Sequence, residues 1–121
     1  RDIGVTGVQT CALPIFEDAD DYIPHIQHAL DEVGATLQPD DLLIHNAGMD
    51  PYEYCSTGGL AGITKQILVE REALIARWAV AHQLRRVACL AGGYHGEQFS
   101  KDELSDLHCM SVRTFLQIDG E

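Results

Sequence analysis

Hydrophobic residues recur at helical spacing in three segments of the chain. Between residues 22 and 33 they fall on one face of a helix, which Gly34 can stop. A second helical pattern runs through residues 63–78, and we expect it to pack against a sheet. The third lies near the C-terminus, where Ser100 or Asp102 can serve as the helix cap.

Two short apolar runs between these helices predict strands. Leu42–Asn46 is bounded by polar and turn residues, which favours a strand buried on both faces of a parallel sheet, with a buried helix turn as the alternative. The second run is Val87–Ala91, and we expect Arg85 and Arg86 before it to be solvated at the surface. The order helix, strand, helix, strand, helix predicts an α/β fold, a mainly parallel sheet with flanking helices.

The first residues of the chain are interpreted separately from the rest. Residues 1–15 resemble a peptide found at the ends of unrelated predicted proteins, where sequencing adapter has been translated as coding sequence. We therefore expect residues 1–16 to be non-native and residues 17–121 to form the structured unit, at most one domain by size. The alternative is a native first strand from Ile3 to Val8.

The chain is strongly acidic, with 8 Lys and Arg against 19 Asp and Glu and a formal net charge of −11. This balance argues against direct nucleic-acid binding and tolerates a cationic ligand. No apolar run approaches the roughly 18 residues of a membrane span, so no membrane contact is expected. Neither a secretory signal nor a Cys-x-x-Cys pair is present, which predicts a cytoplasmic protein with free thiols. The oligomeric state is left open.

The most informative position follows the first predicted strand. Asn46, Gly48 and Pro51 end regular pairing and predict a loop. In open α/β sheets ligands bind at the carboxyl ends of the strands, which is where Asp50 is expected. A carboxylate there can bind a metal, hold a ribose, act as a base or cap the next turn.

Two motifs resemble the zinc-dependent deacetylases of the histone deacetylase and acetylpolyamine amidohydrolase family. Residues 46–51, continuing through 56–60, are similar to the late metal-ligand motif of that family. Residues 90–94 look like its glycine-rich strand end with the active-site tyrosine. The resemblance covers residues 17–117 and implies the C-terminal part of an arginase/deacetylase-like fold.

The resemblance implies a role for each matching residue. Asp50 corresponds to the last aspartate that binds zinc, an ion that would polarise the amide carbonyl and activate its bound water. Tyr94 corresponds to the tyrosine whose hydroxyl donates to the oxyanion. Gly92 and Gly93 would turn the chain sharply and line the channel for the acyl-lysine. The implied substrates are acetylated lysine in a protein or an acetylated polyamine.

The departures from the family pattern concern the rest of its site. The tandem histidines and the earlier aspartate and histidine ligands have no counterpart here and are expected upstream of residue 17. Where several relatives carry an aspartate five positions after the metal ligand, this chain has Cys55, which leaves the hydrogen bonding of the loop open. We therefore expect the parent protein to be an enzyme and this chain alone to be inactive. As an alternative, the chain is a partial α/β module that acts as an acidic interaction surface.

Residues 44–48 also resemble the Asn-Ala-Gly segment of short-chain dehydrogenases. That family needs a glycine fingerprint after its first strand, and the glycine expected after Gly7 is missing. It also needs a lysine four residues after a tyrosine, and none of the four tyrosines meets this condition. A dehydrogenase-like fragment is therefore the less favoured alternative.

Three histidines at metal-like spacings are interpreted as chance. His25 and His28 lie off the apolar stripe of the first helix, and His108 belongs to an Asp-x-His within the last helix. We expect them to be remote from the site. Asp50 and Tyr94 should instead open onto one cleft, with the carboxylate and the phenol roughly 4 to 8 Å apart.

Overall fold

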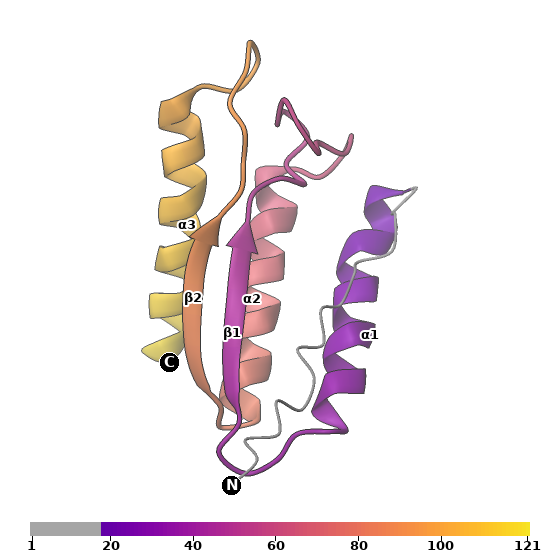
Figure 1. Cartoon of the computed structure of the whole chain (residues 1–121), viewed down its shortest axis with the longest axis vertical. Coiled ribbons are helices and arrows are strands. Elements are labelled where there is room, and N and C mark those ends of the chain that lie inside the picture. The colour runs from indigo at the N-terminus through magenta and orange to yellow at the C-terminus, as the bar shows by residue number, and fades with distance from the viewer. Residues whose placement is uncertain (1–17) are drawn as a thin grey trace, which may run out of the picture.

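The computed structural model describes residues 18–121 (Figure 1). The non-native segment expected at residues 1–16, and the alternative strand from Ile3 to Val8, lie outside the described residues. The elements, in chain order, are the 3-10 helix η1 Ala19–Asp21, α1 Tyr22–Gly34, β1 Leu42–Gly48, α2 Lys65–Ala81, β2 Arg85–Ala91 and α3 Lys101–Asp119.

The strands β1 and β2 are parallel neighbours in a two-stranded sheet. Their register pairs Leu42 with Arg85 at one end and Gly48 with Ala91 at the other. The mixed α/β class and the parallel pairing are therefore confirmed for the described chain. Because the strands run in the same direction, both loops that follow them leave the same edge of the sheet.

Helices α2 and α3 cover one face of this sheet and lie behind the strands in Figure 1. α1 stands beside β1, where it packs against α2. His45 and Ala47 of β1 face this layer and are buried, whereas Leu42 and Ile44 are 51% and 65% exposed. The expectation of a strand buried on both faces is thus wrong within residues 18–121, because side chains alternate between two faces and only one is covered.

Polar caps begin the helices that follow the two strand-end loops. The hydroxyl of Thr64 accepts a hydrogen bond from the backbone N–H of Ile67 at 3.3 Å and caps α2. Ser100, rather than Asp102, caps α3 in a reciprocal capping box with Glu103. Between these helices lies a core whose largest buried side chains are Tyr22, Ile26, Met49, Ile63, Leu68, Ile75, Phe99, Leu107, Met110, Phe115 and Ile118.

A search of residues 18–121 for a membrane-spanning segment finds no helix with the length and apolar character that one requires.

Arg85 and Arg86 differ from the prediction because they begin β2 instead of preceding it. Arg85 donates to the backbone carbonyl of Asp40 at 3.0 Å. The guanidinium of Arg86 contacts the Asp119 carboxylate and lies 5.8 Å from the centroid of the Phe115 ring. The expected solvation of Arg86 is therefore wrong: its side chain is only 13% exposed, because it lies on the sheet face that α3 covers.

Candidate functional site

The loops that follow β1 and β2 are hydrogen-bonded to each other. The N–H of Met49 donates to the carbonyl of Ala91 at 3.2 Å, which extends the strand pairing by one step. Further along, the N–H of Ser56 donates to the carbonyl of Tyr94 at 2.9 Å. The Ser56 hydroxyl also donates to the carbonyl of His95 at 2.9 Å. These bonds hold the two loops together as one surface at the carboxyl edge of the sheet.

The Asp50 carboxylate lies between the ends of the two strands. A β-carbon added at Gly48 would be 3.1 Å from its Oδ2, and one added at Gly92 would overlap the carboxylate group. Gly92 also has a φ of +58°, a left-handed conformation that glycine adopts without strain. Asp50 can occupy this position only because Gly92 has no side chain.

Gly93 allows a second close approach at the same edge. Its φ is +87°, and an added β-carbon would be 3.0 Å from Cβ of Met49 and closer still to Leu104. The two consecutive glycines thus let the loop after β2 pass directly over the loop after β1. Both glycines have the positive φ that a residue with a side chain rarely adopts, but the chain makes no turn or bend at these two positions. Their part in a substrate channel stays a prediction.

Tyr94 leaves the same edge, and its side chain is 51% exposed. Asp50 also lines a groove of about 560 Å³ between α1 and β1, whose walls include Ile26 and Ile44. Tyr94 does not line this groove. The shared edge of Asp50 and Tyr94 is therefore confirmed, and a shared cleft with a defined distance stays a prediction.

A buried charged network beneath the end of β1 was not foreseen from the sequence. Nη1 of Arg71 donates to the carbonyl of Gly48 at 2.8 Å and to the hydroxyl of Tyr22 at 3.1 Å. Its Nε donates to Oε1 of Glu72 at 3.0 Å, and Nη2 contacts the same carboxylate oxygen. The other oxygen, Oε2, lies 2.7 Å from Nε2 of His45. These contacts connect α1, α2 and β1.

The network favours the charged forms of both members of the ion pair. Burial by itself would raise the pKa of Glu72, but the hydrogen bond with His45 and the charge of Arg71 outweigh it and lower the pKa. Burial would lower the pKa of Arg71, and Tyr22 and Glu72 together raise it instead. One sequence signal could have revealed the pair, because Arg71 lies three residues after Leu68 on the buried face of α2.

Cys55 stabilises the Asp50 loop through a hydrogen bond to its backbone. Its thiol donates to the carbonyl of Met49 at 3.1 Å, and the side chain is buried. Burial raises the pKa of this thiol, so the neutral, donating form is favoured. The hydrogen bonding that the sequence left open at this position is thereby defined.

Two of the three histidines at metal-like spacings make other contacts, whereas Nδ1 of His108 is buried within the described chain without a hydrogen-bond partner. Nδ1 of His25 lies 2.8 Å from the carbonyl oxygen of Asp21, and Nε2 of His28 lies 3.5 Å from the carboxylate of Glu32. Within residues 18–121, no three His, Cys, Asp or Glu side chains come together as a metal site. Because a catalytic zinc site takes three protein ligands, the described residues do not form one by themselves.

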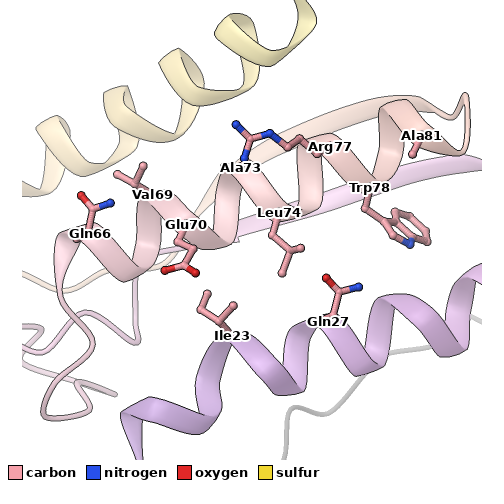
Figure 2. Close-up of a pocket in the computed structure, with 10 residues that line it drawn as sticks. All are labelled: Ile23, Gln27, Gln66, Val69, Glu70, Ala73, Leu74, Arg77, Trp78 and Ala81. Carbon is pink, nitrogen blue, oxygen red and sulfur yellow. The ribbon is translucent and has the colours of Figure 1, made fainter. Parts of the chain in front are cut away.

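A second groove, of about 680 Å³, lies between α1 and α2, away from the strand ends (Figure 2). Ile23 and Gln27 of α1 face Leu74 and Trp78 of α2 across it. Trp78 is buried against this helix pair, as its position in the helical pattern predicted. None of the residues predicted for the site lines this groove.

Comparison with known proteins adds no family to this picture, since no family model, curated protein or solved structure matches the chain. What supports a function is the arrangement of residues at the carboxyl edge of the sheet.

Proposed function

We propose that the complete protein is a zinc-dependent amidohydrolase that deacetylates acetyl-lysine in a protein or an acetylated polyamine, in the cytoplasm. Asp50 supplies one carboxylate to the metal, and Tyr94 supplies a hydroxyl donor to the oxyanion. The observation that carries this proposal is the contact of the Asp50 carboxylate with Gly92, two residues before Tyr94. It brings the two family-like motifs into one structural unit.

The local structure suits these roles. Asp50 is partly buried, so its carboxylate is shielded from bulk water and is still accessible to a metal ion. The side chain of Tyr94 is half-exposed, so its phenol is accessible to a substrate. The net charge of −11 favours a substrate that carries further, unacetylated amines, such as a lysine-rich protein segment or a polyamine.

A second candidate concerns this polypeptide on its own. Residues 18–121 contain no group of three metal-binding side chains, so this part of the chain supplies one proposed zinc ligand and not a complete set. We propose that it is catalytically inactive in isolation and behaves as a partial α/β module with an acidic interaction surface. The missing ligands then belong to sequence that precedes residue 17 in the complete protein.

The decisive experiment is to recover the uninterrupted reading frame and express its product. We expect an upstream tandem histidine pair and an Asp-x-His, about one zinc ion per chain, and hydrolysis of an acetyl-lysine peptide or an acetylated diamine. Asp50→Asn should abolish zinc binding, whereas Asp102→Asn, at an exposed position of α3, should not. An upstream sequence without these ligands, or an expressed protein that neither binds zinc nor hydrolyses these substrates, would contradict the proposed enzyme function.

The isolated 121-residue chain tests the second candidate in the same assays. Stoichiometric zinc binding together with hydrolysis by this chain would show that the inactive-module proposal is wrong.

A further inference from the structure

We propose that Arg71 is a positioning residue, which holds the end of β1 so that the Asp50 carboxylate stays against Gly92. The proposal concerns the geometry of Asp50 and stands on contacts within the described chain. Only its consequence for metal binding rests on the proposed function.

The guanidinium acts on the backbone immediately before Asp50. Its Nη1 donates at 2.8 Å to the carbonyl of Gly48, the last residue of β1. Two residues later the Asp50 carboxylate fills the space beside Gly92. A change in the direction of the Gly48 peptide would therefore displace Asp50 through Met49, the single residue between them.

Arg71 is itself held from two sides. The Tyr22 hydroxyl accepts from Nη1 at 3.1 Å, and the Glu72 carboxylate accepts from Nε and Nη2. Glu72 is fully buried and is held in turn by His45, which stacks on Phe115 with ring centroids 5.5 Å apart. A planar guanidinium can serve Gly48, Tyr22 and Glu72 at once, which the single ammonium of a lysine cannot do in the same geometry.

Charge balance makes an arginine compatible with a metal-binding neighbour. Arg71 and Asp50 line the same groove, so an unpaired guanidinium would oppose a cation bound at the carboxylate. The Glu72 carboxylate forms a salt bridge with the guanidinium and neutralises its charge. The pair can thus orient the strand end without adding net positive charge beside Asp50.

Amide NMR on the 121-residue chain tests the positioning directly. Arg71→Met should shift the amide resonances of Met49, Asp50 and Gly92, whereas Arg77→Met, at an exposed position of the same helix (Figure 2), should leave them unchanged. Arg71→Lys keeps the charge and the aliphatic stem, and it serves as the test variant if Arg71→Met does not fold. A folded Arg71 variant with the three resonances unchanged would overturn the proposal.

The complete protein tests the consequence. Arg71→Lys should weaken Zn²⁺ binding about 10- to 100-fold, as is typical when a group that orients a metal ligand is changed. The visible spectrum of the Co²⁺-substituted protein should change with it, whereas Arg77→Lys should alter neither measurement. If the wild-type protein binds no Zn²⁺, the proposed enzyme fails and the NMR result alone decides the positioning. Unchanged Zn²⁺ affinity and Co²⁺ spectrum in Arg71→Lys would overturn its role at the metal.

Discussion

The carboxylate of Asp50 lies directly against the α-carbon of Gly92. The two residues come from loops that follow neighbouring parallel strands, and the hydrogen bond from Met49 to Ala91 joins those loops at 3.2 Å. A β-carbon at Gly92 would overlap the carboxylate, so the contact depends on glycine. Gly92 thus sets both the path of the loop after β2 and the position of the Asp50 carboxylate.

Gly92→Ala should destabilise the chain and displace Asp50. The left-handed conformation costs a residue with a β-carbon about 1–2 kcal/mol, and the overlap with the carboxylate adds to that. Urea unfolding of the 121-residue chain measures the loss. Gly120→Ala is the matched control, because its φ is −91° and the nearest atom to an added β-carbon lies 3.5 Å away. Equal stability of the two variants would contradict the close packing at Gly92.

Tyr94→Phe should lower kcat of the proposed complete enzyme about 10²- to 10³-fold with little change in Zn²⁺ affinity, since it removes the proposed oxyanion donor and no metal ligand. Steady-state kinetics and Zn²⁺ titration provide the two measurements. Tyr54→Phe, at another half-exposed tyrosine of the neighbouring loop, is the control and should keep wild-type kcat. A Tyr94→Phe enzyme as fast as wild type would remove the donor role.

Acid should destabilise the chain through Glu72. Folding lowers the pKa of this carboxyl below its ordinary value of 4.5, so the carboxylate stabilises the fold above that pH. The stabilisation is lost as pH falls through the lower, folded pKa. Urea unfolding between about pH 6 and pH 3 should therefore show a steeper loss of stability in the wild type than in Glu72→Gln. Glu70→Gln, at an exposed position beside it, should keep the wild-type slope; identical slopes in all three chains would exclude this linkage.

Cys55 should react with alkylating reagents more slowly than Cys89 and Cys109. Its thiol is buried and bonded to Met49, and its raised pKa lowers the fraction of reactive thiolate, whereas Cys89 and Cys109 are exposed. Mass spectrometry of peptides after timed iodoacetamide treatment gives the rates. In denaturant the differences should vanish. Fast labelling of Cys55 in the folded chain would show that the Asp50 loop opens readily.

The sequence by itself determined the order of the elements and the positions of Asp50 and Gly92–Tyr94 at strand ends. Helical periodicity and short apolar runs are local patterns, so they can be recognised without knowing what each element packs against. Boundaries were less well defined, since β1 extends to Gly48 and β2 begins at Arg85. Backbone pairing between the strands extends both elements beyond their apolar runs.

Only the tertiary structure decided how these residues meet. The contact of Asp50 with Gly92 depends on the register of two strands, which no local pattern encodes. The bond between His45 and Glu72 spans 27 residues, and it forms because α2 returns across the sheet and places its buried face under β1. From the sequence alone, Arg71 and Glu72 only interrupt an apolar helix face. The partners that surround them in the folded chain show why these charges are stable there.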